Sequence, residues 1–414
     1  MKRILLLSTL IVYNFFYSNT LDVTQFGANG KDTKDDTTAF QKCADQLAAL
    51  GGGTMEIPLG TYYISHVKFF GKKYSNITFK GNGSTIKQVF LGKRILIERW
   101  NSYSRINAAD GCFLFDAQVS KQFDDRNSIK NIIIDNLHFV SDVVKLGFDE
   151  LSHQISAHGV SGFTVKNSSF TGFLGDGISI NAGIDFTKNY GAYNKDVTIE
   201  NCKFDGINNE NRQGISFYYC DGFLVENCSF KNITRDGMPA AIDVEPMDNW
   251  QVSRNGIIRN CDFTNIGGVA AIVIFLMDKS KENPVKSSYG FIIENCNFNK
   301  VRTPLAVIGN DSYRNYNDGE NKIIFQNSTI DGFKTILDFR KAYEVLYDNL
   351  TFKNNDKLYF YKQENEFNNF TIKSSLFENT DIQKNFLINK NSLKNLKFEN
   401  NRIINNGKSS TFFF

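Results

Sequence analysis

The sequence predicts an all-β fold, a single-stranded right-handed parallel β-helix of about ten coils with a short N-terminal capping helix. Three observations lead to this prediction: a repeated Asn motif, a short alternating strand before each copy, and an amphipathic segment ahead of the first copies. The chain has 414 residues, 41% of them hydrophobic, which is enough apolar material for one long core. We expect a cap and first coil over residues 20–65 and the β-helix over residues 66–414.

The repeat is an Asn followed three residues later by Phe or Ile, at intervals of about 21 to 35 residues. Each copy follows a period-two run such as Phe223–Glu226, which predicts a strand that enters a tight turn. A unit of this size cannot close a core alone, so neighbouring units must stack in parallel. We expect the Asn side chains to form a hydrogen-bonded ladder. The copies begin at Asn136, Asn167, Asn201, Asn227, Asn260, Asn295, Asn327, Asn349 and Asn395, with Ser374 as a variant.

Four of the seven cysteines occupy one position of the repeat: Cys202, Cys228, Cys261 and Cys296. Because inward apolar residues flank this position, we interpret the four as a buried stack of small side chains. Disulfides are the alternative, but each stacked Cys would have two equivalent neighbours and no unique partner. A zinc site is disfavoured, since no CxxC spacing occurs.

A capping helix is predicted over Asp36–Leu50, where Phe40, Cys43, Leu47 and Leu50 share one face and glycines follow. Such a cap would cover the apolar end and the strand edges of a solenoid.

The N-terminal region also carries a family signature. Asp22-Val-Thr-Gln-Phe-Gly-Ala28, Asp35-Asp-Thr-Thr-Ala-Phe40 and Ile57-Pro-Leu-Gly-Thr-Tyr62 resemble the N-terminal signature of the pectate-lyase-like superfamily. That superfamily includes polygalacturonase-like hydrolases, polysaccharide lyases and phage tailspikes. The resemblance implies a right-handed β-helix that acts on or binds glycans.

Residues 1–19 are expected to be a signal peptide, because Lys2 and Arg3 precede an apolar run from Ile4 to Phe16. Cleavage is expected near Ser18 to Thr20, and an uncleaved anchor is the alternative. We therefore expect a secreted or periplasmic protein that has no membrane contact after cleavage. The 47 basic and 44 acidic residues are nearly balanced and form no dense basic cluster, so nucleic acid is not an expected partner. The oligomeric state is left open.

A polar patch is predicted on one outward face of the solenoid. Segments that contain Ile155, Ile178, Ile215, Ile242 and Ile272 align on an inward Ile. Since strands of successive coils lie about 4.8 Å apart, equivalent outward residues form columns. The two columns are Ser156, Ser179, Ser216, Asp243 and Val273, and His158, Asn181, Tyr218, Glu245 and Phe275.

Asp243 and Glu245 are the leading catalytic candidates. They stand two apart on one strand, with Cβ atoms roughly 6–7 Å apart, the range that paired carboxylates use in glycoside hydrolysis. Crowding should raise the pKa of one of them and suit it to general acid catalysis. An exposed acidic strand with no function is the alternative, although Asp and Glu are poor strand formers.

Other residues are predicted to support this pair. Arg212 is interpreted either as a clamp for a substrate carboxylate or sulfate, or as a salt-bridge partner of Asp243 or Glu245. Asp176, in Gly175-Asp-Gly-Ile178, resembles a coil motif of polygalacturonase-like enzymes, which implies a catalytic role; ordinary turn chemistry is the alternative. His158-Gly159 resembles the His-Gly of the same hydrolases, but it precedes the acidic strands here. That order disfavours strict polygalacturonase identity.

Substrate contacts are expected from His158, Tyr218, Asn181 and Arg212, and from aromatic residues on long insertions. Trp250 and Tyr313 lie on such insertions and offer flat faces on which sugar rings stack.

The sequence therefore favours an extracellular glycoside hydrolase that acts on a polysaccharide with Asp243, Glu245 and Asp176, without a metal or other cofactor. A polysaccharide lyase is the first alternative; it would take its base from His158, Tyr218 or Arg212 and would use the acidic pair to hold Ca²⁺. A non-catalytic glycan-binding solenoid is the second.

Overall fold

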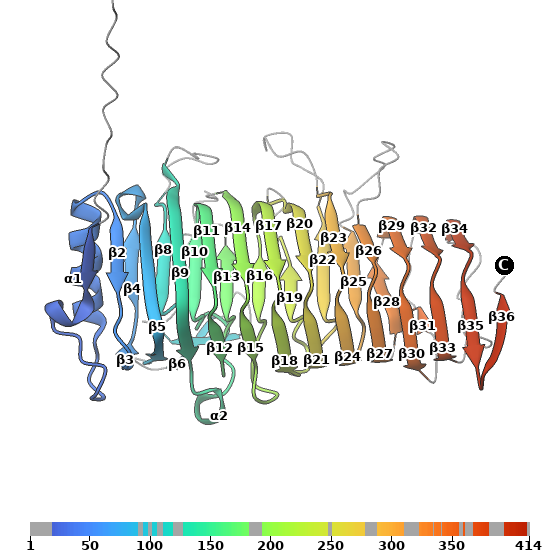
Figure 1. Ribbon diagram of the computed structural model, residues 1–414, viewed down its shortest axis with the longest axis horizontal. Helices are drawn as coiled ribbons and strands as arrows, with labels where there is room; N and C mark the ends of the chain where they lie inside the picture. The colour runs from blue at the N-terminus through green and yellow to red at the C-terminus, as the bar shows by residue number, and fades with distance from the viewer. Residues whose placement is uncertain are drawn as a thin grey trace, which may run out of the picture.

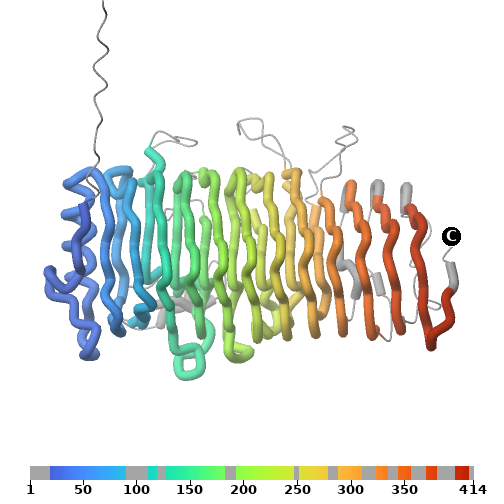
Figure 2. The backbone as a smooth tube through the Cα atoms, viewed as in Figure 1, coloured from blue at the N-terminus to red at the C-terminus, as the bar shows by residue number. Residues whose placement is uncertain are grey.

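The computed structural model is one elongated stack of parallel strands with a helix at its N-terminal end (Figure 1). The backbone advances from end to end, coil by coil (Figure 2). This confirms the predicted right-handed parallel β-helix. The structure describes residues 19–89, 94–97, 102–105, 111–118, 127–181, 193–246, 251–277, 288–309, 323–333, 335–340, 342–355, 359–360, 367–380 and 393–411.

One face of the solenoid is a ten-stranded parallel sheet, which carries the polar columns predicted above. Its strands, in chain order, are β4 (Val67–Phe70), β8 (Phe113–Asp116), β10 (Ile155–His158), β13 (Ile178–Asn181), β16 (Ile215–Phe217), β19 (Ile242–Val244), β22 (Ile272–Leu276), β25 (Leu305–Gly309), β28 (Thr335–Arg340) and β31 (Tyr359–Phe360).

A second series of parallel strands leads into the Asn turns of the repeat. It comprises β1 (Thr20–Asp22), β2 (Gly53–Glu56), β5 (Ile77–Gln88), β9 (Ile129–Val140), β11 (Val160–Lys166), β14 (Asn194–Glu200), β17 (Cys220–Glu226), β20 (Arg254–Arg259), β23 (Phe291–Glu294), β26 (Ile323–Gln326), β29 (Ala342–Asp348), β32 (Phe367–Lys373) and β34 (Leu393–Glu399).

A third series follows those turns, and β5 and β9 are long enough to run through both. It comprises β3 (Thr61–Ile64), β12 (Ser169–Thr171), β15 (Lys203–Asp205), β18 (Ser229–Ile233), β21 (Asp262–Ile266), β24 (Asn297–Val301), β27 (Thr329–Phe333), β30 (Thr351–Asn355), β33 (Leu376–Thr380) and β35 (Arg402–Asn405). Two pairs are antiparallel: β6 (Arg94–Ile97) with β7 (Ser102–Arg105), and β35 with β36 (Lys408–Thr411).

The repeated Asn residues are the corners between the second and third series. Asn136, Asn201 and Asn260 have φ angles of 57°, 54° and 54°, in the left-handed region that Asn tolerates better than most residues. The expected side-chain ladder is present between Asn349 and Asn327, at 2.9 Å. At Asn167 the side chain instead donates to Asp135, at 2.8 Å. The repeat therefore reflects backbone conformation more than a continuous ladder.

The last predicted copy of the repeat is out of register. Asn395 lies inside β34, and the equivalent corner is Asn400, whose φ is 55°. The pairing of Phe377 with Ile403 shows that Ile403 takes the inward Phe position of this coil. The pattern Asn-x-x-Phe at residues 395–398 matches the repeat by chance, because it lies within the alternating sequence of a strand.

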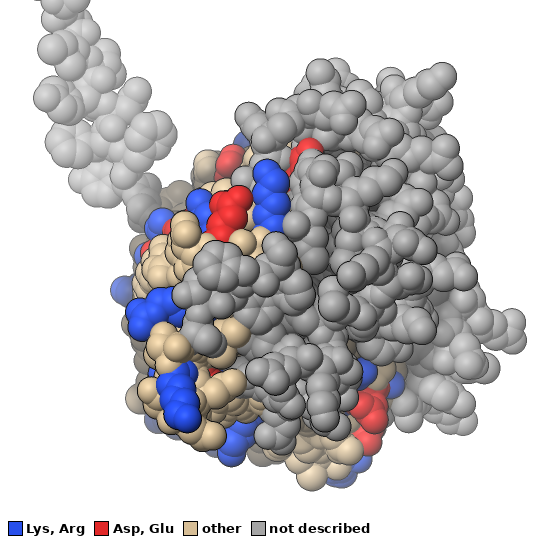
Figure 3. Space-filling view, turned by 90° about the vertical axis from the view of Figure 1, so that its right-hand side faces the viewer, with Lys and Arg blue, Asp and Glu red and all other residues tan. Residues whose placement is uncertain are grey.

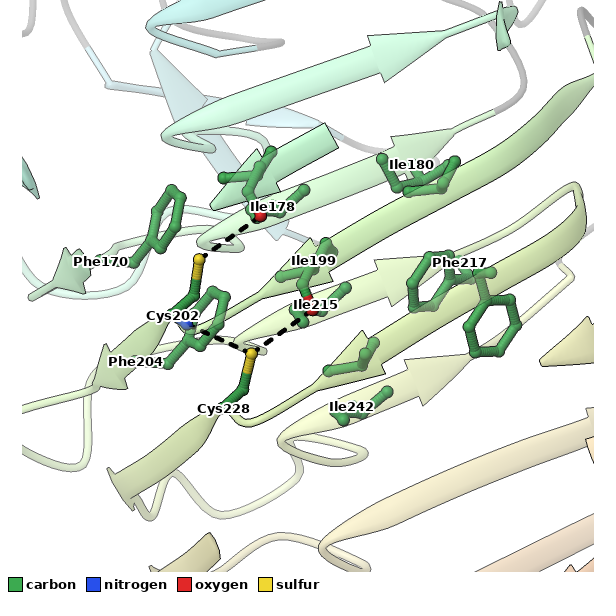
Figure 4. Packing of buried hydrophobic residues seen from close by; sticks show 14 of the residues in the cluster. Phe170, Ile178, Ile180, Ile199, Cys202, Phe204, Ile215, Phe217, Cys228 and Ile242 are labelled. Atoms are coloured by element: carbon green, nitrogen blue, oxygen red, sulfur yellow. Dashed lines mark hydrogen bonds between the residues drawn. The ribbon is translucent and has the colours of Figure 1, made fainter. Parts of the chain in front are cut away.

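The core is a stack of like residues on successive coils. The rings of Phe170 and Phe204 are nearly parallel, with centroids 4.8 Å apart (Figure 4). Phe230 continues the stack on the next coil, with its ring centroid 4.8 Å from that of Phe204. Cys202 and Cys228 lie beside them, and the Cys202 backbone N–H donates to the Cys228 sulfur at 3.4 Å. All seven cysteines are buried and free, which confirms the interpretation of a small-residue stack over disulfides.

The cap is α1 (Thr37–Ala49), with short 3₁₀ turns at Val23–Phe26 and Lys72–Tyr74 on either side of it in the sequence. Phe40, Cys43 and Leu47 are fully buried against the first coil, as predicted. Leu50 is not, because it caps the helix C-terminus and is 46% exposed. A second short helix, α2 (Val143–Leu146), lies on a loop that projects from the solenoid (Figure 1).

Basic and acidic side chains lie close to one another on the described surface seen from the C-terminal end (Figure 3). Examples along the coils are the pairs Arg254–Asp221 and Lys231–Asp205, at 2.6 and 3.0 Å. Among the described residues, neither helix has the length and apolar character needed to cross a membrane.

Candidate functional site

The register of the ten-stranded sheet reproduces the predicted columns. Ile155, Ile178, Ile215, Ile242 and Ile272 pair in series and are fully buried in the core. The outward neighbours pair in the same order, from Ser156 through Ser179 and Ser216 to Asp243 and Val273.

The second outward column continues past the ends of the shorter strands. His158 pairs with Asn181. The Tyr218 backbone N–H then donates to the carbonyl of Ile180, and that of Glu245 to the carbonyl of Phe217, both at 3.0 Å. These bonds place Tyr218 and Glu245 on successive coils after Asn181.

A third polar column precedes these strands, and sequence reasoning missed it. It consists of His153, Asp176 and Gln213, each two residues before an inward Ile. Strict alternation would point this position into the core. At this corner, however, Ala241 and Ile242 both lie in the core, whereas Ala240 packs in a separate cluster with Val273. The break in alternation turns the whole column outward.

Asp243 is the most buried carboxyl of the acidic pair, with no exposed surface. Its Oδ2 accepts from Gln213 Nε2 at 2.7 Å, and the Glu245 carboxyl lies close enough to act on its charge. Burial raises the pKa of Asp243 well above the usual range, and the neighbouring Glu245 raises it further. A raised pKa favours the protonated form of Asp243, which is the form that a general acid needs.

Asp176 lies in a different environment, although it too is fully buried. One carboxylate oxygen accepts from the Arg212 guanidinium, and the other accepts from Ser216 Oγ at 2.8 Å. His153 lies beside it, with Nδ1 3.4 Å from Asp176 Oδ2. That Nδ1 also accepts the Asp176 backbone N–H at 2.9 Å, so the imidazole is neutral there and the contact is not an ion pair.

Arg212 joins the parts of the site. Besides Asp176, its guanidinium donates to the Tyr218 hydroxyl at 3.3 Å and lies 3.3 Å from Glu150. Burial opposes its charge, but the carboxylates and Tyr218 around it raise its pKa well above the usual value. Its salt-bridge partners are thus Asp176 and Glu150, whereas the sequence had suggested Asp243 or Glu245.

Tyr218 and His158 are both buried and both neutral near pH 7. Burial raises the pKa of Tyr218 far above its ordinary value, although Arg212 opposes this. Burial lowers the pKa of His158 to about 3, with a smaller contribution from His153. His158 Nε2 shares a hydrogen bond with Ser156 Oγ at 3.2 Å. Neither side chain has the pKa that a general base needs near neutral pH, so neither suits the proton abstraction that a lyase requires.

Several buried polar atoms of these columns have no protein partner: Ser179 Oγ, His158 Nδ1, Asp243 Oδ1 and Gln213 Oε1. Buried polar groups are normally hydrogen-bonded, so such a concentration indicates a place where a polar ligand or water completes the bonding. All four atoms belong to the polar columns.

The remaining candidates have different outcomes. Asn181 is half-buried at the end of β13, where its carbonyl accepts from Asn194 Nδ2 at 2.8 Å. Trp250 and Tyr313 lie outside the described residues, as do most of the predicted insertions and residues 1–18 of the expected signal peptide. Glu150 was missed because it lies on a loop with no repeat to align it.

No group of three or more His, Cys, Asp or Glu side chains suited to a metal ion occurs among the described residues. The Asp243–Glu245 pair alone supplies two carboxyl groups, and one of their oxygens is already bonded to Gln213.

Fold and site together define a β-helix protein with a buried acidic site on one sheet. Residues 20–239, just over half of the chain, match the model of the family described as rhamnogalacturonase A/epimerase, pectate lyase-like. The chain belongs to this family, which confirms the superfamily resemblance of its N-terminal signature. A search of curated proteins found no match.

Solved structures with the same fold span almost the whole chain. An exopolygalacturonase from Thermotoga maritima is 11% identical, with a TM-score of 0.59 over 95% of this chain and 93% of its own. A mannuronan C-5 epimerase A-module from Azotobacter vinelandii is 15% identical, with a TM-score of 0.57 over 92% and 98%. A surface adhesin of Streptococcus pneumoniae is also 15% identical, with a TM-score of 0.54 over 94% and 90%. At these identities the similarity concerns the fold.

Proposed function

We propose that this protein is an extracellular glycoside hydrolase that cleaves a polysaccharide with the Asp243–Glu245 pair. The observation that carries the proposal is the state of Asp243. It is fully buried, its pKa is raised, and Glu245 follows it by two residues, just past the end of β19. A carboxyl group whose pKa is raised by burial, next to a second carboxyl, is what acid-assisted glycosidic cleavage requires.

In this mechanism Asp243 gives its proton to the glycosidic oxygen as the bond to the anomeric carbon breaks. Glu245 takes a proton from the water that attacks that carbon. The two Cβ positions, two residues apart on one strand and roughly 6–7 Å from each other, allow the carboxyl groups to turn apart around a bound sugar.

Arg212 and Asp176 support the pair. Arg212 lies within electrostatic reach of Glu245 and holds the Tyr218 hydroxyl. Asp176 accepts a hydrogen bond from the guanidinium and is itself held by a hydrogen bond from Ser216 Oγ. We assign Asp176 to positioning Arg212, because both of its oxygens are already bonded.

The lyase alternative receives less support. A lyase needs a base that removes a proton from carbon, together with a cationic group for the uronate carboxylate. Tyr218 has a raised pKa, His158 is too weakly basic, and Arg212 is committed to two carboxylates.

Extracellular location is proposed from the apolar leader of residues 1–19. N-terminal sequencing of protein recovered outside the cytoplasm tests it.

The test of activity incubates the mature protein with neutral and acidic polysaccharides and follows reducing ends and enoyl-uronate absorbance. Asp243→Asn and Glu245→Gln should each lower the release of reducing ends by about a hundredfold or more. Asp262→Asn is the matched control, because Asp262 is an exposed carboxylate on β21. Absorbance that a calcium chelator abolishes would establish a lyase, and glycan binding without any product would establish a binding solenoid.

A further inference from the structure

We infer that the sugars bound on either side of the cleaved bond are neutral, so that the substrate class is a glycan without carboxylates at this site. The inference rests on the proposed function and concerns the recognition surface around the Asp243–Glu245 pair.

The charge of the Arg212 guanidinium is already neutralised by protein carboxylates. Arg212 is bonded to Asp176, to Tyr218, and to Glu150 at 3.3 Å, and its side chain is only 10% exposed. A substrate carboxylate that approached Arg212 would have to displace a buried protein carboxylate, which would then be left unpaired.

Among the described residues, Arg235 is a second guanidinium whose charge interacts with Arg212. Its guanidinium lies 3.6 Å from the centre of the Phe148 ring, among the charges of Glu150 and Glu210. It is therefore also engaged by the protein. In the part of the chain that the structure describes, four acidic groups act on these two cations: Asp176, Glu150, Glu245 and Glu210. The acidic groups outnumber the cations, so a uronate would meet net repulsion from this part of the site.

The unpartnered polar atoms near the acidic pair belong to uncharged groups that suit sugar hydroxyls. Ser179 Oγ and His158 Nδ1 are buried, without a protein partner, and lie on the coils that precede Asp243. A hydroxyl and a neutral imidazole suit sugar hydroxyl groups, which both donate and accept hydrogen bonds. Charged recognition of a carboxylate would call for a cation at these positions.

The outward columns change from polar to apolar residues on the coils that follow the acidic pair. After Asp243 and Glu245, the same two columns continue as Val273 and Phe275 on β22, then Ala306 and Ile308 on β25. Val273 and Ala306 pack together, with Phe275 and Ile308 partly exposed beside them. An apolar surface of this kind suits the C–H face of a neutral sugar ring.

The experiment compares acidic polysaccharides with their carboxyl-reduced forms, in which each uronate becomes a neutral hexose and the linkages are unchanged. Release of reducing ends is measured with the wild-type protein, and binding by calorimetry with Asp243→Asn. The reduced forms should bind at least about tenfold more tightly than their acidic parents, since one uncompensated like-charge contact is enough to weaken binding about tenfold. Their KM should be nearly independent of salt.

Two pairs of variants, each with its own control, sharpen the comparison. Ser179→Ala should weaken binding of the reduced forms about tenfold, because a hydrogen bond to the sugar is lost in a buried site. Thr164→Ala, on β11 of another face, should leave binding unchanged. Phe275→Arg should restore binding of the acidic parents, whereas Phe275→Gln should not.

Tighter binding or faster cleavage of the acidic parents would overturn the inference while leaving hydrolysis intact. Preferential binding of the reduced forms without release of reducing ends would instead contradict the proposed hydrolase and leave the neutral preference standing. Absence of binding to both sets would overturn the inference.

Discussion

Two neighbouring parts of the ten-stranded sheet share their inward residues and differ in their outward ones. On β10, β13, β16 and β19 the columns carry serines, His158, Tyr218 and the acidic pair, whereas on β22 and β25 they carry Val273, Phe275, Ala306 and Ile308. The first inward position of each strand is Ile or Leu, and the second is also apolar, in both parts. Core packing therefore dictates the fold, and the outward columns vary with little effect on it, which is how one scaffold hosts a local site.

Placing a carboxyl group one coil further on, at Val273, tests whether the polar coils accommodate a buried carboxyl group better than the apolar coils do. Val273→Asp should destabilise the protein by about 4 kcal/mol, because the new carboxylate would be buried among apolar side chains without a hydrogen-bond donor. Chemical denaturation measures the change. Val273→Thr, of similar shape, should cost only about 1–2 kcal/mol. Equal costs for the two variants would contradict the idea that the polar coils are specially arranged.

Breaking the ion pair inside the polar part should have the next largest effect. Arg212→Met should cost about 3 kcal/mol, since it leaves the fully buried Asp176 carboxylate unpaired. The double variant with Asp176→Asn should lose less than the sum of the two single variants. Strictly additive losses would show that Arg212 and Asp176 do not stabilise each other. Arg259→Met removes a partly exposed surface pair with Glu226 and should have a much smaller effect.

The corners of the solenoid should respond in the same way in both parts. Asn260→Ala should cost about 1 kcal/mol, because Ala disfavours the φ of 54° that this corner requires. Asn260→Gly should be close to neutral, and thermal unfolding distinguishes the two. Catalytic activity should not change in either variant. A loss with Gly as large as that with Ala would mean that the Asn side chain, not the backbone, matters.

Much of the fold could be predicted from the sequence, because each coil repeats the same local constraints. The Asn corners, the inward Ile series and the buried cysteines all follow from patterns with a fixed period. The prediction failed at Asn395, where the repeat weakens, and at Leu50, where the helix ends.

The site was less accessible to sequence reasoning. The columns through Asp243 and Glu245 follow from alternation, but the column through His153, Asp176 and Gln213 does not, because two successive residues face the core at that corner. The partners of Arg212 depend on a loop residue, Glu150, whose position only the folded chain reveals.

The claim that Asp243 is held protonated by its surroundings is central to the site. Its pKa is raised in the folded state relative to the unfolded value of about 3.9. The protonated carboxyl therefore contributes stability that is fully present below the unfolded pKa and is lost as the pH rises through the folded pKa. Asp243→Asn, which cannot ionise, does not have this loss.

The most direct measurement is the free energy of unfolding of the wild type and of Asp243→Asn between about pH 4 and pH 8. The two proteins should differ increasingly as the pH rises, with the wild type losing stability relative to the variant. Asp262→Asn, at an exposed position, should show no such trend. A difference that is independent of pH, or one in which the wild type gains stability with rising pH, would contradict the assignment of Asp243 as the acid of this site.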